Sequence, residues 1–242
     1  RYYAVILSFV GNPMNFPLPA DLLSAFSSAF TQNNRLLKLR FSPSAGVADD
    51  SLLPWTLTGH EAINVGYRYE LACLSASAYL PLKDLIGQPV EVSLLTDSGD
   101  YRPLCGWVTE ARQDGADGGI ARYTLVIQDL FALLRLRTNN RIQQEISAKD
   151  AVLNIVQEHR ARNAILADSL DIDDRTTRDY PTQALISQLD ESDAAFIQRK
   201  LADEGINFYF EYGDSGVCAD RPKVTLVLFD DNNQLPDNPA GT

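Results

Sequence analysis

Short runs of alternating apolar and polar residues recur through the first half of the chain and limit its fold more than any other feature. The clearest runs are Leu36–Phe41, Tyr67–Leu71, Val90–Leu94, Leu104–Ala111 and Tyr123–Ile127. Alternation with a period of two predicts strands that bury one face. Turn-forming clusters at Asp97–Asp100 and Asp114–Gly119 end two of these strands. Strands this short and this regularly spaced predict a barrel or a sandwich.

Four further segments are predicted as strands, the last two of them joined as a hairpin. They are Tyr2–Val10, Leu185–Leu189, Ile206–Tyr212 and Val224–Phe229. Tyr2–Val10 also resembles the apolar part of a signal peptide, but no small-residue cleavage site follows it and it is too short to span a bilayer. Asp168–Asp179 is polar and charged, which predicts a loop around one short strand.

Helices are predicted in few places, and all of them are short. The candidates are Leu18–Phe30, Pro81–Ile86, Asp129–Leu136, the stretch from Ser147 to about Arg160, and the stretch from Ser192 to Gly205. Ser147 and Ser192 are suited to capping the first free amides of a helix, and Gly205 is suited to a left-handed stop. Together with the strands, these helices predict a β-rich α+β fold.

Composition and charge exclude several classes of function. The 242 residues are enough for one large domain or two ordinary ones, and 45% hydrophobic residues can form a core. Asp and Glu outnumber Lys and Arg by 32 to 21, which gives a formal charge of -11. A chain this acidic repels phosphate backbones and anionic bilayers, so we expect no nucleic-acid partner and no membrane surface.

The cysteines and histidines do not form a recognisable reactive or metal-binding pattern. Cys73, Cys105 and Cys218 are odd in number and far apart, which argues against disulfides and zinc and suits a reducing cytoplasm. His60 is expected in a surface loop, and His159 at the surface near a helix C-terminus. HExxH, GxSxG, GxGxxG and P-loop motifs do not occur in the sequence. We therefore predict no catalytic residue, no metal ligand, no cofactor and no enzymatic activity.

Paired acids are the remaining candidates for chemistry. They are Asp49-Asp50, Asp173-Asp174, Asp190-Glu191 and Asp230-Asp231. Adjacent carboxylates point in different directions, whereas glycosidases hold two across a cleft, so we interpret these pairs as solvated. Asp171, Asp173 and Asp174 loosely resemble a calcium loop, but it lacks the turn glycine and the closing glutamate, and arginines follow it.

The segment Asp190–Phe210 is the most specific part of the sequence. Ser192 is a predicted N-cap, and Asp193 is favourably placed at the positive end of the helix dipole. Phe196, Ile197 and Leu201 fall on one face of the helix. Gly205 then directs the chain into the following strand. Local physics therefore predicts a rigid helix-to-strand unit without reactive chemistry.

This unit resembles the signature of the VgrG spike proteins of type VI secretion. The residues that carry the resemblance are Glu191, Ser192, Asp193, Phe196, Leu201, Glu204, Gly205, Tyr209 and Phe210. Four earlier segments resemble that family in the same order: Leu85–Val90, Gly106–Glu110, Arg122–Leu125 and the start of Arg141–Val152. The resemblance extends from about Leu22 to Leu235, almost the whole chain.

The resemblance implies a fold like the baseplate hub of contractile phages, with two barrel-like β domains and short helices between them. It divides the chain into an N-terminal extension and short helix at 1–34, a first barrel-like hub domain at 35–137, and a helical and strand linker with the start of the second hub domain at 138–242. The family's oligosaccharide/oligonucleotide-binding domain and its β-helical needle would lie beyond Thr242.

The resemblance also implies a structural role and a set of partners. It implies a homotrimer in the full-length protein, whose six similar barrels match a hexameric inner tube. Baseplate components and effectors are further expected partners, and membranes are met only through the needle. The family is assembled in the cytoplasm of Gram-negative bacteria and secreted without a signal peptide. A phage tail baseplate hub protein and a secreted hydrolase effector are the alternatives.

Overall fold

The computed structural model describes residues 5–10, 31–32, 35–213 and 221–235. Backbone contacts divide the chain into two units, each of which is considered by itself. Unit 1 comprises Arg1–Ala62, Gly66–Leu130 and Tyr212–Val224, and unit 2 comprises Ile63–Val65, Phe131–Glu211 and Thr225–Thr242. The predicted helix at Leu18–Phe30 and most of the expected 1–34 extension lie outside the described residues.

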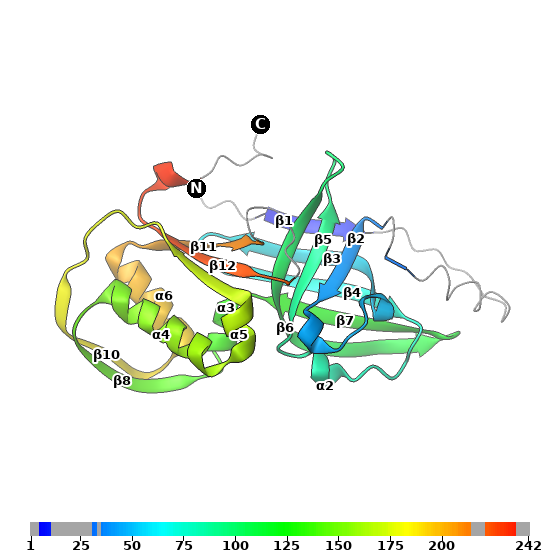
Figure 1. The fold of residues 1–242 in the computed structure, drawn as a ribbon, viewed down its shortest axis with the longest axis horizontal. Helices are drawn as coiled ribbons and strands as arrows, with labels where there is room; N and C mark the ends of the chain where they lie inside the picture. Colours follow the sequence, from blue (N-terminus) through cyan, green and yellow to red (C-terminus); the bar gives the residue numbers. More distant parts are fainter. Residues whose placement is uncertain (1–4, 11–30, 33–34, 214–220, 236–242) are drawn as a thin grey trace. The chain divides into compact units, whose positions relative to one another are not determined.

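Unit 1 is built on one seven-stranded sheet (Figure 1). Its order is β1 (Val5–Val10), β3 (Leu53–Ala62), β4 (Gly66–Ser75), β7 (Ile120–Gln128), β6 (Tyr101–Asp117), β5 (Pro89–Leu95) and β2 (Leu37–Phe41). All neighbouring strands run antiparallel. The short helix α2 (Leu82–Leu85) precedes β5, and two 3-10 turns lie at Pro43–Ala45 and Asp49–Ser51. The prediction of a β-rich α+β fold is thus confirmed, and every alternating run forms a strand.

One strand of this sheet was not predicted. His60 was expected in a loop, but it lies on β3, opposite Arg68 of β4. Gly59 made the segment look like a turn in the sequence. In the structure, Gly59 lies within the strand, and the strand requires a glycine at this position. A Cβ at this position would lie 2.4 Å from the Tyr69 Cδ1 atom, so the aromatic ring of the neighbouring strand occupies the space. The contact that requires this glycine comes from another strand, and the local sequence does not show it.

The predicted turn at Asp114-Gly115 was also wrong. β6 continues through it to Asp117, and the register against β7 shifts between Gln113 and Gly115. Asp114 accepts hydrogen bonds from the Thr124 hydroxyl of β7 and from Arg112. An extra residue in one strand is a β-bulge, and these bonds hold it within the sheet. The reversal lies beyond the bulge, at Gly118 and Gly119, which both have positive φ.

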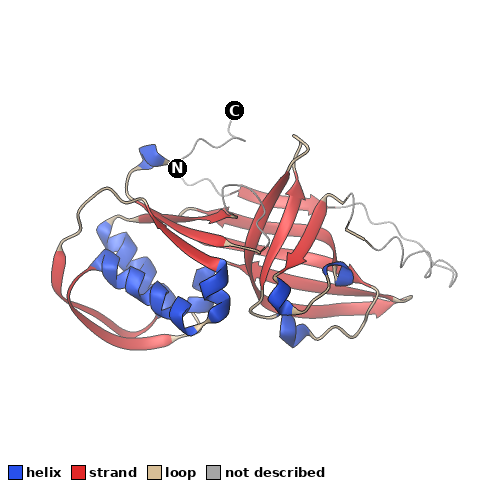
Figure 2. Ribbon diagram, in the orientation of Figure 1, coloured by secondary structure: helices blue, strands red, loops and turns tan. Residues whose placement is uncertain are grey.

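Unit 2 combines two small sheets with the longer helices of the chain (Figure 2). One sheet has the order β11 (Asn207–Tyr212), β12 (Val224–Phe229) and β9 (Leu170–Asp174). The other pairs β8 (Thr138–Ser147) with β10 (Thr182–Ser192), and we call it the ribbon. The helices are α3 (Leu130–Leu134), α4 (Ala148–Arg162), α5 (Ala164–Ser169) and α6 (Asp193–Glu204), and a 3-10 turn lies at Asn232–Gln234.

Most local predictions for this unit are confirmed. Ser147 caps α4 by accepting a bond from the Asp150 amide, and the predicted strand within Asp168–Asp179 is β9. The strands β11 and β12 lie next to one another in their sheet, as the predicted hairpin requires. The helix α5 and the strand β8 were not predicted. β8 is rich in amide side chains, which have low strand propensity, so its pairing with β10 decides its conformation.

None of the helices that the structure describes is long and apolar enough to cross a membrane. Cys73 and Cys105 are both buried. Cys218 lies outside the described residues.

Candidate functional site

The residues of the predicted helix-to-strand unit lie on the end of β10, on α6 and on β11. The Ser192 hydroxyl accepts a hydrogen bond from the Ala195 amide at 3.1 Å, as predicted for an N-cap. Phe196, Ile197 and Leu201 are all buried. Gly205 ends the helix with a φ of 66°, and the Ile206 amide bonds back to the Leu201 carbonyl at 2.8 Å. Both ends of α6 are therefore fixed by local hydrogen bonds.

Asp193 does more than face the helix dipole, because its side chain is fully buried. One carboxylate oxygen accepts bonds from Asn139 Nδ2 at 2.9 Å and from Gln188 Nε2 at 2.8 Å. The other lies 2.7 Å from His159 Nε2 and 3.5 Å from Arg141 Nη2. These partners come from β8, β10 and α4. Asp193 thus joins four elements at one point, which we call the Asp193 node.

His159 was expected at the surface, and this expectation was wrong. Its ring lies in the last turn of α4, as predicted, but only 15% of its side chain is exposed because it packs against Asp193. Burial raises the pKa of Asp193, and hydrogen bonds from Asn139, Gln188 and His159 lower it by more. The pKa of this carboxyl group is therefore below its ordinary value, and the buried group is ionised at neutral pH.

Glu191 and Glu204 bind side chains of the same region from the two ends of α6. Glu191 pairs with Arg199, one of the helix residues. Glu204 Oε1 accepts a bond from Gln183 Nε2 on β10 at 2.9 Å. Both contacts connect α6 to β10. The two glutamates of the motif therefore hold α6 against the ribbon.

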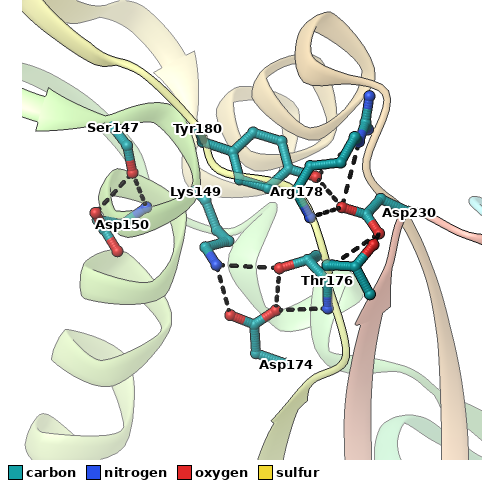
Figure 3. Close-up of polar contacts among 9 residues, drawn as sticks. Ser147, Lys149, Asp150, Asp174, Thr176, Arg178, Tyr180 and Asp230 are labelled. Atoms are coloured by element: carbon teal, nitrogen blue, oxygen red, sulfur yellow. Dashed lines mark hydrogen bonds and ion pairs between the residues drawn. The ribbon is translucent and has the colours of Figure 1, made fainter.

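A second buried carboxylate, Asp230, lies just after β12 (Figure 3). It accepts bonds from the Thr177 amide, the Arg178 amide and the Tyr180 hydroxyl at 2.9, 3.0 and 2.7 Å. Arg178 Nη2 also donates to the carbonyls of Glu204 and Gly205 at 3.1 Å. The Asp230 side chain therefore fixes the loop after β9, and that loop in turn caps the last carbonyls of α6.

The interpretation of the paired acids as solvated was wrong for Asp230. Burial raises its pKa, but bonds from the Thr177 and Arg178 amides and from Tyr180 lower it by more, to well below the ordinary value. Burial and the bond to Asp230 raise the pKa of Tyr180 to about 12, so its hydroxyl remains a donor at neutral pH. Neighbours in the folded chain, not the adjacent Asp231, decide the state of this carboxylate.

The residues that loosely resembled a calcium loop are each paired with a cation. Asp171 contacts Arg160, Asp173 contacts Arg175, and Asp174 contacts Lys149 at 2.9 Å (Figure 3). The carboxylates are distributed along β9 and its end and do not converge on a point. Within the described ranges, no group of three or more His, Cys, Asp or Glu side chains is placed to hold a metal ion.

Tyr209 and Phe210 of the motif are adjacent residues of β11, and their side chains contact different neighbours. The Tyr209 hydroxyl accepts a bond from Arg175 Nη1 and donates to Glu211 Oε1, both at 2.7 Å. The Phe210 ring lies 6.0 Å from the Phe131 ring, in an edge arrangement. One side chain thus belongs to a polar cluster with β9, and the other to an aromatic cluster with α3.

Sequence reasoning missed the residues that complete the two carboxylate sites. Asn139, Arg141 and Gln188 surround Asp193, and Arg178 and Tyr180 surround Asp230. A concentration of amides in β8 was visible in the sequence, but nothing local paired them with Asp193, which lies 54 residues after Asn139. The arrangement suits a set of rigid joints, since the carboxylates at its centre are occupied by bonds within the chain.

The Asp230 site makes stability depend on pH in acid. The pKa of Asp230 is lower in the folded chain than in the unfolded chain. The contribution of this carboxylate to the free energy of unfolding is therefore complete above the unfolded pKa of about 4. The contribution is lost as pH falls through the folded value. We expect urea unfolding of Asp230→Asn and of the natural chain to differ by a constant amount above about pH 5, and by progressively less below about pH 4. A difference that does not change with pH would show that Asp230 ionises alike in both states.

A comparison with protein families identifies relatives. Residues 60–242 match the phage tail baseplate hub (GPD) family. The type VI secretion system spike protein VgrG4b of Pseudomonas aeruginosa is 36% identical over 179 residues, which are 74% of this chain and 20% of that protein. The spike protein VgrG5 of the same organism is 29% identical over 178 residues, 74% of this chain and 21% of that protein. The chain spans about a fifth of the length of these relatives.

Solved structures show the same fold. The Escherichia coli c3393 protein, described as a type VI secretion component similar to the T4 phage tail proteins gp27 and gp5, matches with a TM-score of 0.67. It is 21% identical, and the match covers 83% of this chain and 51% of that one. A Francisella PdpA–VgrG complex matches with a TM-score of 0.50 at 16% identity, over 88% of this chain and 35% of the other. The phage hub-like fold implied by the sequence is thus confirmed.

Proposed function

Because the chain belongs to the phage tail baseplate hub family and resembles type VI secretion spike proteins, we propose that it is the structural hub segment of a contractile injection spike. The observation that carries the proposal is the family match over residues 60–242, which includes the whole Asp193 node. In this role the segment docks the spike onto the inner tube of the apparatus. Its partners would be two further copies of itself, the tube protein, baseplate components and effectors.

The proposed mechanism rests on symmetry and stiffness. In this proposal 35–137 is the first barrel-like hub domain, and 138–242 is the linker and the start of the second. A trimer with two similar domains per chain offers six near-equivalent faces, which a hexameric tube needs. The joints at Asp193 and Asp230 support this role, because buried and bonded carboxylates hold helices and strands in one arrangement. The contracting sheath would supply the work, and the segment itself would carry out no catalysis.

A phage tail hub is the second candidate, and the name of the matching family favours it. The similarity to the Pseudomonas spike proteins favours the secretion apparatus. For the secretion hub we propose assembly in the cytoplasm of a Gram-negative bacterium and export with the spike, without a signal peptide. Nothing among the described side chains favours the hydrolase alternative. Four of the candidate carboxylates are bonded within the fold, namely Asp173, Asp174, Glu191 and Asp230.

Light scattering tests the proposal. The sample is a longer protein that also contains the regions its relatives possess outside this segment. We expect the mass of a trimer, because the hub must present six faces to a hexameric tube. Mixed with tube protein of a type VI apparatus, this trimer should form a complex of one trimer with one hexamer. Tube protein of a contractile phage is the matched control, since preferential binding to it would identify a phage hub. A stable monomer of the longer protein would contradict both candidates.

A further inference from the structure

The outer edge of β11 is occupied at Phe208 by a single residue, Asn64. Asn64 lies in the turn that follows β3, and both Asn64 and Phe208 belong to unit 2. The Asn64 amide donates to the Phe208 carbonyl at 3.0 Å, and the Phe208 amide donates to Asn64 Oδ1 at 2.9 Å. Asn64 Nδ2 also donates to Asn207 Oδ1 at 2.7 Å. Asn64 thus takes both backbone groups of Phe208 and the side chain of the preceding residue.

These backbone groups point to the side of β11 on which a further strand would pair. β11 is an outer strand of its sheet, with β12 on its inner side. At the inner side, the Gly213 amide donates to the Lys223 carbonyl at 3.0 Å. The backbone groups of successive residues point to opposite sides of an antiparallel strand, so Phe208 is directed outward on this alternation. A strand added at the outer edge would need the groups that Asn64 occupies.

The composition of β11 makes an open edge hazardous. Its sequence is NFYFEY, in which four of six residues are aromatic and none is proline, glycine or lysine. Its one charge, on Glu211, is paired with Arg175 through two hydrogen bonds of 2.9 Å. Six-residue segments with high strand propensity, little net charge and no proline pair readily with identical copies of themselves. The strand best suited to pair with β11 is therefore the β11 of a second copy of the chain.

The backbone of the turn does not by itself explain an asparagine at position 64. Asn64 has a φ of 64°, in the left-handed region that asparagine tolerates and glycine adopts freely. Glycine would thus suit the turn equally well. The asparagine side chain adds the bonds to Phe208 and Asn207, and both of these residues belong to β11.

Unit 1 contains a similar arrangement on β2. This strand lies at one end of the seven-stranded sheet. Gln32 Nε2 donates to the Leu39 carbonyl at 2.8 Å, and the Leu39 amide donates to Gln32 Oε1. A side-chain amide offers both a donor and an acceptor, so it can take the place of a peptide group of a neighbouring strand. An outer strand of each unit is thus bonded, at one residue, by a residue with an amide side chain.

We propose that Asn64 blocks the outer edge of β11 against pairing with the β11 strand of a second copy of the chain. Natural sheets protect their outer strands with charges, prolines, bulges or covering elements. Here the turn residue has that role, because it engages the amide and the carbonyl that the incoming strand would bind. Loss of the asparagine side chain would release the Phe208 amide and open the aromatic strand to self-association.

Sedimentation velocity on the 242-residue chain and on Asn64→Gly tests the proposal. Glycine retains the left-handed turn and removes the side-chain amide. At equal concentration, we expect the fraction of chain in dimers and larger species to be at least about fivefold higher for Asn64→Gly than for the natural chain. The matched control is Asn163→Gly in the same unit, because Asn163 Oδ1 also accepts a backbone bond, from the Ile165 amide at 3.0 Å, but at the start of α5. This control should associate no more than the natural chain.

A second substitution shows whether the association occurs through β11. Asn207→Lys, added to Asn64→Gly, puts on β11 the residue that natural outer strands use against pairing. The added lysine also reduces the negative formal charge of the chain by one unit, which weakens general repulsion between copies. A return to the sedimentation of the natural chain would therefore come from the edge itself.

Circular dichroism checks that the variants remain folded. Association caused by unfolding would not be reversed by a single lysine on β11, so the double variant distinguishes it from pairing of strands. The proposal is overturned if Asn64→Gly associates no more than Asn163→Gly. It is also overturned if Asn207→Lys leaves the association of Asn64→Gly unchanged.

This inference does not rest on the proposed hub function. Self-association through β11 is measured on the 242-residue chain, whereas the hub is tested by the trimer of a longer protein and its binding to tube protein. Failure of one experiment therefore leaves the other standing.

Discussion

Replacing Asp193 with alanine is expected to lower the free energy of unfolding of unit 2 by about 3–5 kcal/mol. The buried carboxylate accepts bonds from Asn139, Gln188 and His159 and lies 3.5 Å from Arg141 Nη2. Its removal leaves the donors of Asn139, Gln188 and His159 without their acceptor, whereas Arg141 keeps its ion pair with Glu158 at 2.6 Å. Four elements would lose the point at which they meet.

The tryptophans allow the two units to be followed separately during urea unfolding. Trp55 and Trp107 are the two tryptophans of the chain, and both lie in unit 1. The longer helices α4 and α6 lie in unit 2, so circular dichroism of helix mainly reports that unit. We expect Asp193→Ala to shift the dichroism transition to lower urea concentration, and to shift it more than the tryptophan fluorescence transition.

Asp203→Ala is the matched control for this variant. Asp203 is an acid of the same helix, but 52% of its side chain is exposed and its partner Lys200 is one turn away. A surface pair of this kind contributes less than about 1 kcal/mol. If Asp193→Ala were as mild as Asp203→Ala, the node would not hold the unit together.

Replacing Phe196 with alanine is expected to lower the free energy of unfolding by about 3–5 kcal/mol. The Phe196 ring is fully buried on the inner face of α6. Its removal loses the transfer free energy of the ring and leaves a cavity that a close-packed core fills only in part. The same urea unfolding experiment, followed by dichroism, measures the effect.

Phe196→Leu is the comparison that identifies the cause. Leucine retains most of the apolar volume, so its cost should be well below that of alanine, because the cavity is smaller. Equal costs for the two variants would contradict a cavity origin and would indicate that the aromatic ring itself is required. The Arg199 guanidinium lies 5.5 Å from the centre of that ring, and its contact with the ring would then be the first candidate.

Both predictions concern stability because the proposed role depends on it. A hub that transmits force between a tube and a spike must keep its elements in one arrangement. The motif that most resembles the spike family is also the segment on which the Asp193 node, the α6 caps and the Phe210 contact converge. The motif residues are therefore explained by the contacts that they make within unit 2. The resemblance to the family does not by itself provide this explanation.

The sequence by itself determined the features that depend on near neighbours. Alternation decided five of the seven strands of unit 1, namely β2, β4, β5, β6 and β7. The caps at Ser147, Ser192 and Gly205 were predicted because each bonds within one turn of its own helix. The buried stripe of α6 followed from helical spacing in the same way. These interactions join residues a few positions apart, so a single sequence shows them.

The tertiary structure decided the features that depend on distant residues. Gly59 lies in a strand because the Tyr69 ring of the next strand fills the space of a side chain, and β8 is a strand because β10 pairs with it. Asp193 and Asp230 are buried because Asn139 and Arg178, 54 and 52 residues away, bring donors to them. A carboxylate is solvated or buried according to the donors that folding places around it, and the chain order does not record those donors.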